Sequence, residues 1–438
     1  MSPNKKSSSK VRTWLILAHC FNMDGRAASQ TITDKIPFIR KAGILPVVLS
    51  APTGTRDSQF PHYQIFSPAP SGVLFEGRHI IKKRFAKKSL EKSFKALLTL
   101  ICLPFLIIEK VFVQLDSQWS WALSASLKGR QLIERFKPEL IYSTAGPPST
   151  HAAGYFLCRI TGLPWLAEVH DPLIQADEYP RWHNYFFKKW LEKKIWSQAD
   201  AVIYFTEKAR QSAAGRNPGK KNAFVLRPGA GMPDLQDGQY QKRPAMHLGH
   251  FGSLADDRNL ATVIKALQAL ITENPAWKDI LRLDVYGTEP DPVSAIHLKR
   301  FPLPKMMNLY GRLEYDPVTG KTGRQQVLEA MCKTDVLLLI HGDAKGVSEY
   351  IPSKLYEYLF TGRPIVGLVS PGSELQTMLR ETGHQAVDQH DIQAVKRVIA
   401  EQVARWQASG LENSDRRSRY TVDETVRRLI TIADKVIR

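Results

Sequence analysis

Two glutamates flank a short stretch that combines a cation with a possible helix start. Glu349 lies eight positions before Glu357, and Ser353 and Lys354 lie between them. If this stretch is helical, Ser353 and Glu357 lie on one face, one turn apart. The free N–H groups at a helix start, together with the charge of Lys354, form a site for an anion. A carboxylate one turn further on would accept hydrogen bonds from a ribose diol, so the pattern fits a nucleotide diphosphate.

The residues around this stretch predict where the helix begins and ends. Pro352 suits the first helical position, where its missing N–H is not needed. Gly362 suits the C-terminal cap, and Pro364 prevents the helix from continuing. Apolar runs at 335–340 and 364–368 indicate buried strands on either side. The helix would then start at the carboxyl edge of a parallel sheet, where open α/β sheets bind their ligands.

The glutamate pair, the helix between two strands and the Gly-x-Pro exit together resemble glycosyltransferase family 4, the retaining enzymes of GT-B fold. The resemblance implies an α/β protein of two Rossmann-like domains, whose parallel sheets face a central cleft. It implies a catalytic contact of Glu349 with the donor sugar and a contact of Glu357 with the ribose. Ser353 and Lys354 would belong to the same donor-binding group.

Two further motifs extend the resemblance. After Gly252, the family usually places one basic residue beside the glycine and another five positions further on, both on the diphosphate. Arg258 fits the second position, and Ser253 replaces the first. A separate apolar run ends in His170 and Asp171. The family's strand there often ends in a histidine that reaches into the cleft from the acceptor domain, which implies a catalytic role for His170.

Two loops of the first half also bear on the resemblance. Residues 143–151 resemble a loop of bacterial surface-polysaccharide transferases in this family. Gly25 lies in the loop 22–28, which lacks the paired glycines of many members. We place Gly25 and Asp171 on the acceptor side of the cleft.

The expected chemistry needs positive charge at the diphosphate. Breaking a glycosyl–phosphate bond leaves an oxocarbenium-like sugar and a diphosphate with growing negative charge. Other transferases neutralise that charge with a divalent ion held by an Asp-x-Asp motif, and no such motif ends an apolar run here. Arg258, Lys354 and the helix start would stabilise the charge instead. We therefore expect a nucleotide-diphosphate sugar as donor, with no metal and no cofactor.

The rest of the chain alternates short apolar runs with amphipathic stretches, which is typical of helices around parallel sheets. The apolar runs are 14–18, 46–50, 140–143, 165–169, 201–205 and 223–226, and then 247–251, 281–286, 335–340 and 364–368. A length of 438 residues suits two domains. We predict a disordered basic tail (1–10), an acceptor domain (11–228), a linker (229–244), a donor domain (245–415) and a final helix (416–438) able to pack across both domains.

The charge of the chain favours an anionic partner. Lys and Arg outnumber Asp and Glu by 61 to 42, which gives a net charge of +19. Nucleic acid is disfavoured, because no RNP, zinc-finger or helix-turn-helix signature accompanies the charge. The four cysteines are scattered, which indicates a reducing compartment. The first apolar run is too short for a signal peptide. We expect a cytoplasmic protein that could lie on the inner membrane.

Residues 82–115 form a possible membrane-contact segment. The basic run 82–88, with Lys92 and Lys95, precedes 13 uncharged residues at 96–108. Such a run is too short to span a bilayer, which needs about 20 residues. A basic flank suits in-plane contact with an anionic leaflet, and Pro104 would bend or end a helix there. The alternative is a buried helix with a solvated basic face.

The site residues also have structural interpretations. Glu349 and Glu357 could be solvated charges at helix ends, and Lys354 could be a surface lysine. His170 could orient a loop, and Arg258 could pair with Asp256 or Asp257. We interpret His19 and His151 as structural.

The predicted function is retaining transfer of a sugar to a glycan or lipid-linked acceptor, in cell-surface polysaccharide or lipopolysaccharide synthesis. One alternative is a nucleotide-sugar epimerase of GT-B fold, which would need further acid and base groups that the sequence does not identify. Another is a non-catalytic scaffold of a polysaccharide assembly system. A scaffold would be expected to lose its charged cleft residues, and these are present.

Overall fold

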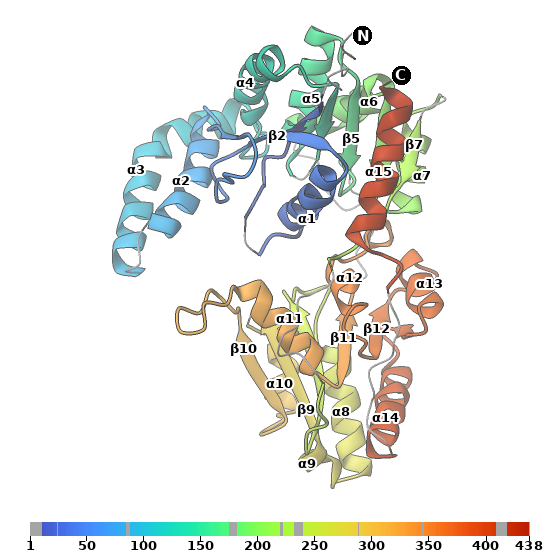
Figure 1. Ribbon diagram of the computed structural model, residues 1–438. Coiled ribbons are helices and arrows are strands. Elements are labelled where there is room, and N and C mark those ends of the chain that lie inside the picture. The colour runs from blue at the N-terminus through green and yellow to red at the C-terminus, as the bar shows by residue number, and fades with distance from the viewer. Residues whose placement is uncertain are drawn as a thin grey trace.

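The computed structural model describes residues 11–23, 25–84, 88–144, 146–174, 182–219, 222–231, 240–287, 289–342, 346–408 and 418–437. They form two α/β domains, one above the other in Figure 1. Parts of four predicted segments lie outside the described residues: the tail (1–10), part of the basic run (85–87), part of the linker (232–239) and the start of the final helix (416–417).

The first domain is built on a seven-stranded parallel sheet in the order β3-β2-β1-β4-β5-β6-β7. Its strands are β1 (Arg12–Leu17), β2 (Ile44–Ser50), β3 (His62–Gln64), β4 (Leu140–Ser143), β5 (Trp165–Val169), β6 (Ala201–Tyr204) and β7 (Ala223–Val225). The central strands are buried apolar runs, as parallel sheets covered on both faces require. The strand order reverses between β1 and β4, so a crevice forms at their carboxyl ends.

Helices cover both faces of this sheet. They are α1 (Ala27–Lys41), α4 (Trp121–Phe136), α5 (Pro148–Thr161), α6 (Trp182–Gln198), α7 (Glu207–Arg216) and, from the end of the chain, α15 (Val422–Val436). Two further helices, α2 (Pro70–Arg84) and α3 (Lys88–Phe112), pack along each other beside the sheet (Figure 1). One face packs against α4, α5 and α6 in a single core. The other packs against α1 and α15, so the last helix of the chain belongs to the core of the first domain (Figure 1).

The second domain has a six-stranded parallel sheet in the order β10-β9-β8-β11-β12-β13. Its strands are β8 (Met246–Gly252), β9 (Leu281–Gly287), β10 (Met307–Gly311), β11 (Val336–Ile340), β12 (Ile365–Val369) and β13 (Gln385–Asp388). Its helices are α8 (Ala261–Glu273), α9 (Trp277–Ile280), α10 (Pro292–Arg300), α11 (Gly323–Lys333), the 3₁₀ turn η1 (Val347–Glu349), α12 (Lys354–Tyr358), α13 (Glu374–Glu381) and α14 (Ile392–Ala408). The two sheets have the same Rossmann-type strand order, which confirms the predicted pair of Rossmann-like domains.

Every apolar run predicted to be a strand is one in the structure, within one or two residues at each end. Three strands were not predicted: β3, β10 and β13. All three lie at sheet edges and none is fully buried, so they lack the continuous apolar run that marks an internal strand.

Two helices differ from the predicted boundaries. The helix α12 begins at Lys354 rather than Pro352 and ends at Tyr358, so it has little more than one turn and its dipole is weak. The helix α3 does not end at Pro104 but continues to Phe112. It loses one backbone hydrogen bond there, and its packing along α2 maintains it. Within the described residues, no helix combines the length and apolar character needed to cross a membrane.

Candidate active site

Two connected cavities lie between the domains, at the carboxyl edges of both sheets. The larger has a volume of about 640 Å³ and the smaller about 350 Å³. The larger contains the predicted residues Gly25, Gly252, Ser253, Lys354 and Glu357, the smaller contains His170, Asp171 and Glu349, and both contain Arg258 and Ser353. The structure therefore brings all the predicted site residues together, from both domains.

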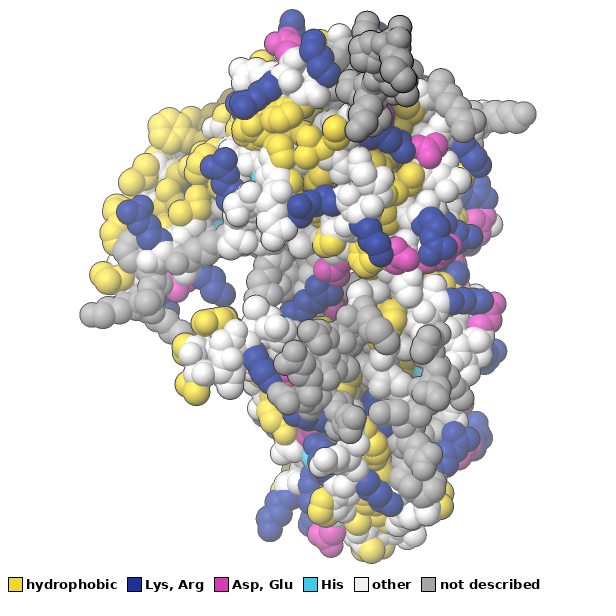
Figure 2. Space-filling view, viewed as in Figure 1, with side chains coloured by type: hydrophobic (Ala, Val, Ile, Leu, Met, Phe, Trp, Pro, Cys, Tyr) yellow, Lys and Arg dark blue, Asp and Glu magenta, His cyan; other side chains and the backbone are white. Residues whose placement is uncertain are grey.

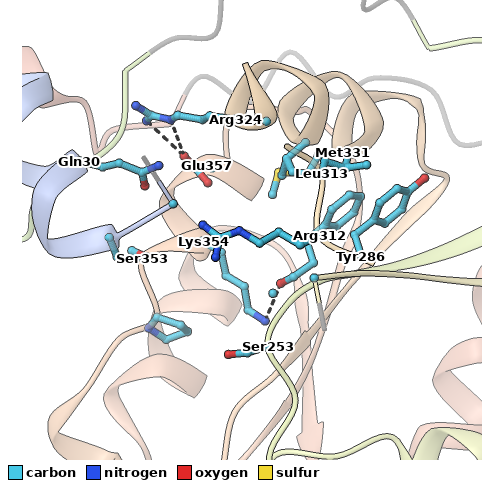
Figure 3. Close-up of a pocket in the computed structure, with 18 of the residues that line it drawn as sticks. Gln30, Ser253, Tyr286, Arg312, Leu313, Arg324, Met331, Ser353, Lys354 and Glu357 are labelled. Carbon is cyan, nitrogen blue, oxygen red and sulfur yellow. Dashed lines mark hydrogen bonds and ion pairs between the residues drawn. The ribbon is translucent and has the colours of Figure 1, made fainter. Parts of the chain in front are cut away.

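Lys354 lies at the floor of the larger cavity, behind the turn that follows β8 (Figure 3). Its Nζ donates to the carbonyl of Phe251 at 3.0 Å. Burial, reinforced by the charge of Arg258, lowers the pKa of Lys354 to about 7. Gly252 beside this ammonium has φ +119°, a backbone conformation that residues with a side chain rarely adopt. Lys354 is therefore a half-buried amine held against a backbone carbonyl, which excludes the surface-lysine interpretation.

Arg258 borders both cavities, in the loop between β8 and α8. Its buried Nε has no hydrogen-bond partner among the described residues. Among the described residues, no ion pair joins Arg258 to Asp256 or Asp257. Asp257 turns instead toward Gly342, where a Cβ would lie 2.3 Å from its Oδ2. Arg258 and Lys354 thus provide two positive charges around a common space, as a diphosphate requires.

Glu357 is held by an arginine that the sequence analysis missed. Arg324, in the first turn of α11, donates from Nε to Glu357 at 3.2 Å (Figure 3). Its two terminal nitrogens donate to Asp34 of α1 at 2.9 and 2.8 Å. Burial raises the pKa of Glu357, and the charge of Arg324 opposes that rise. Because Asp34 belongs to the first domain, the predicted ribose site is joined to a contact between the domains.

An aromatic and apolar surface forms one side of the larger cavity. Tyr286 stacks between Phe251 and Tyr310, with ring centroids 4.5 and 4.3 Å apart. It lines the cavity together with Leu313, Val327 and Met331. A flat ring such as a nucleobase suits this surface, since such rings pack well on apolar and aromatic side chains.

Gly25 and Arg312 meet across the cleft. Gly25 has φ +69°, and a Cβ there would lie 2.2 Å from a terminal nitrogen of Arg312. Arg312 follows β10 and extends into the cavity (Figure 3). A residue with a side chain at position 25 would therefore displace this guanidinium and be strained by the positive φ. Gly25 was placed on the acceptor side, and in the structure it also borders the cavity that contains Lys354 and Glu357.

Glu349 lies at the end of η1 and contacts the first domain. Its carbonyl accepts a hydrogen bond from Thr206 Oγ1 at 2.8 Å, and its carboxylate accepts one from Ser212 of α7. The side chain borders the smaller cavity opposite His170. Glu349 is therefore held by two residues of the first domain and is not a solvated helix-end charge.

His170 follows β5 and rests on a buried polar network. Its Nε2 lies 2.9 Å from Thr144 Oγ1 and 3.2 Å from Glu168 Oε2. Glu168 is fully buried and forms a salt bridge with Lys35 of α1. The neighbouring Asp171 is exposed, and partial desolvation by the surrounding protein raises the pKa of its carboxyl. His170 and Asp171 were predicted from the sequence, and the residues beneath them were not.

No group of three or more His, Cys, Asp or Glu side chains among the described residues could hold a metal ion. The start of α12 offers fewer aligned N–H groups than predicted, because the helix is so short. Within this cleft, the positive charge available to an anion therefore comes mainly from the side chains of Arg258, Lys354 and Arg312.

Residues 111–229 match the family described as Glycosyl transferase 4-like domain. The matched range contains His170 and Asp171 and ends before the second sheet, so Glu349 and Glu357 lie outside it. Comparison with curated proteins gives no match.

Solved structures match this chain over nearly its whole length. HepE of Anabaena, solved with UDP and glucose, is 12% identical, with a TM-score of 0.58 over 97% of this chain and 100% of that chain. TarM is 10% identical, with a TM-score of 0.64 over 96% and 98%. Sucrose-phosphate synthase from Thermosynechococcus elongatus is 12% identical, with a TM-score of 0.62 over 97% and 98%. At such identities the shared property is the fold, and the predicted GT-B fold is confirmed.

Proposed function

We propose that the protein is a retaining glycosyltransferase that moves a sugar from a nucleotide-diphosphate sugar to a glycan or lipid-linked acceptor, in the synthesis of a cell-surface polysaccharide or lipopolysaccharide. The observation that carries the proposal is one continuous cleft containing Arg258, Lys354 and Glu357 of the second domain and His170 of the first. The family match of the first domain supports the reaction class. The solved complex of HepE with UDP-glucose supports a nucleotide-sugar donor.

The donor would lie along the cleft in an extended form. Its base would pack beside Tyr286, and its ribose diol would bind Glu357, where Oε2 has no partner among the described residues. The diphosphate would contact Lys354 and Arg258. Because Arg258 borders both cavities, the sugar would then point into the smaller cavity, between Glu349 and His170.

This arrangement supports a reaction driven by charge stabilisation. As the bond from the sugar to the phosphate breaks, Arg258 and Lys354 stabilise the growing charge of the leaving diphosphate. The carboxylate of Glu349 stabilises the oxocarbenium-like sugar. The acceptor hydroxyl attacks from the face that the phosphate leaves, and the departing phosphate takes its proton. Retention of configuration follows from attack on that face.

A thermal-shift panel of UDP-, GDP-, ADP- and dTDP-sugars tests the donor. A ligand that binds the folded state alone stabilises it by about 2.7 kcal/mol at 100 times its Kd, so the true donor should raise the Tm. The Arg258→Ala variant should show a smaller shift. If no nucleotide-diphosphate sugar raises the Tm of the wild type, the proposed function is wrong.

Replacing Glu357 with alanine should weaken nucleotide binding. The ribose hydroxyls lose a charged acceptor, which is worth about 1.5–3 kcal/mol. Titration calorimetry with the nucleoside diphosphate measures the change in the folded variant. Glu329→Ala, which removes a glutamate of α11 paired with Lys321, is the control. Unchanged affinity in Glu357→Ala would remove this residue from the site.

Transfer should proceed without a divalent ion, because Arg258 and Lys354 would stabilise the negative charge of the diphosphate in its place. Activity measured in excess EDTA should equal activity in magnesium or manganese. Complete loss of transfer in EDTA, restored by either ion, would contradict the proposed phosphate site.

The membrane-contact segment presents an apolar surface. Eleven large apolar side chains of α3 are exposed, namely Leu90, Phe94, Leu97, Leu100, Ile101, Leu103, Phe105, Ile107, Ile108, Val111 and Phe112. Figure 2 shows hydrophobic side chains gathered over α2 and α3, with Lys and Arg side chains among them. A buried core helix would turn these side chains inward, so the alternative interpretation of this segment does not fit the structure.

Exposed aromatic residues of α6 extend this surface. Trp182, Phe186 and Trp190 follow one another at intervals of four, and Trp182 is 73% exposed. Asn184 of the same helix donates to Asp116, in the loop after α3, at 3.2 Å, so the start of α6 lies near the end of α3. Tryptophan and lysine together suit a bilayer interface with anionic headgroups. This supports a peripheral enzyme on the cytoplasmic face of the inner membrane.

Liposome co-sedimentation tests the membrane contact. The wild type should bind vesicles that contain anionic lipid, and binding should weaken with salt. Replacing Leu100, Ile101 and Phe105 with serine should release the protein, since each buried apolar side chain contributes about 1.5–3 kcal/mol. Ile296→Ser changes an exposed isoleucine of the second domain and serves as the control. A wild type that stays in the supernatant at low salt would overturn the membrane contact.

A further inference from the structure

A buried ion pair lies beneath His170. Lys35 of α1 and Glu168 of β5 are both fully buried and form a salt bridge. The second oxygen of Glu168, Oε2, accepts hydrogen bonds from the hydroxyls of Tyr142, at 2.7 Å, and Thr144. Burial opposes ionisation, yet Lys35 and His170 hold the pKa of Glu168 well below its usual range. A full negative charge therefore lies at the base of the cleft.

The hydrogen bonds around this carboxylate define which nitrogen of His170 carries the proton. A threonine hydroxyl has one hydrogen, and that of Thr144 points to Glu168. The 2.9 Å contact between Thr144 Oγ1 and His170 Nε2 must therefore be donated by the histidine. The same Nε2 lies 3.2 Å from Glu168 Oε2, so a proton on Nε2 has two acceptors.

We infer that Glu168 is a positioning residue that holds His170 as the Nε2–H tautomer, leaving the lone pair of Nδ1 for a hydroxyl of the transferred sugar. Among the described residues, Nδ1 of His170 has no hydrogen-bond partner. The ring borders the same cavity as Glu349 and Arg258, and it packs on Phe205 at 4.5 Å. The inference rests on the proposed function in one respect only: it names a sugar hydroxyl as the donor of the hydrogen bond that Nδ1 accepts.

This tautomer limits what His170 can do. A neutral imidazole with a free Nδ1 accepts a hydrogen bond from a hydroxyl and has no proton facing the cleft. It can therefore orient the sugar by accepting a hydrogen bond, and it cannot donate a proton from Nδ1. The salt bridge with Lys35 also ties this orientation to α1, the helix that carries Asp34.

Nitrogen-15 spectroscopy of the full-length protein tests the inference. Long-range proton–nitrogen correlations of labelled histidine, recorded at about pH 8, distinguish the two neutral tautomers. The signals absent from a His170→Gln variant identify His170 among the 12 histidines. We expect the Nε2–H form in the wild type and a mixture of tautomers in Glu168→Gln.

Two further variants separate the positioning role from folding. The double variant Lys35→Met, Glu168→Gln removes both charges, so no unpaired cation remains buried, and it should also show mixed tautomers. Tyr142→Phe is the matched control, because it removes one hydrogen bond to the same oxygen and keeps the carboxylate. It should retain the tautomer of the wild type.

Transfer provides a second measurement. In the double variant kcat should fall about 10- to 100-fold, the range seen when the partner that orients a functional histidine is removed. Affinity for the nucleoside diphosphate should not change, since Glu357 and Lys354 lie in the other domain. An Nδ1–H signal in the wild type, or an unchanged tautomer in both variants, would overturn the inference. If the tautomers are as expected but the wild type transfers no sugar, the inference is supported. Only the proposed function is then contradicted.

Discussion

Replacing Lys354 with methionine should lower transfer about 100- to 1,000-fold, the range found when one preorganised donor is removed from an active site. Lys354 lies at the floor of the cavity, near Arg258, where it would face the leaving diphosphate. The fold should survive, because an uncharged side chain of similar length replaces a half-buried amine. Steady-state kinetics measure the loss, and Lys299→Met, at an exposed lysine of α10, is the control.

The same replacement should also remove a pH dependence. The pKa of Lys354 is lowered to about 7 by burial and by Arg258. Because the charged form binds the diphosphate, affinity should be full below about pH 7 and fall as the pH rises above it, by up to about tenfold per unit. Calorimetry with the nucleoside diphosphate between about pH 6 and pH 8.5 measures this slope. A wild-type affinity that stays flat over this range would show that Lys354 does not contact the phosphates.

The parts of the site that could be predicted from the sequence are local in the chain. Glu349, Lys354 and Glu357 lie within one turn-and-helix segment, and the apolar runs around them indicated a sheet edge. The internal strands were predictable for the same reason, because a buried parallel strand is itself an apolar run. In contrast, the edge strand β10 is half-exposed and carries no such pattern.

The parts that could not be predicted join residues far apart in the chain. Arg324 and Asp34 are separated by 290 positions, and Lys35 and Glu168 by 133. Charged residues are common, so no spacing pattern marks such pairs before the fold brings them together. Periodicity also failed to show which sides of α3 face solvent, because its apolar residues surround most of the helix.

Contacts between the domains involve the proposed donor site directly. The carboxylate of Glu349 accepts from Ser212 of the first domain. Glu357 shares Arg324 with Asp34, also of the first domain. Donor binding and the approach of the two domains should therefore influence each other, since a ligand that orders Glu357 also orders the arginine that bridges the cleft.

Replacing Arg324 with alanine should have the second-largest effect, a fall in kcat/KM of about 30- to 1,000-fold. The variant leaves Asp34 and Glu357 facing each other without their cation, and removing one partner from such a pair costs about 2–4 kcal/mol at partial exposure. Affinity for the nucleoside diphosphate should fall as well, because Glu357 loses the contact that holds it in place. Steady-state kinetics and calorimetry measure the two losses.

Asp34→Asn separates the two roles of this arginine. It weakens the pair between the domains and leaves the 3.2 Å contact of Arg324 with Glu357. Nucleotide affinity should therefore stay near that of the wild type, while kcat falls because the domains close less tightly around the sugar. Small-angle scattering with bound nucleotide should show a larger radius of gyration for both variants. If Asp34→Asn lost as much nucleotide affinity as Arg324→Ala, the arginine would act on the donor only through closure of the domains, and not through Glu357.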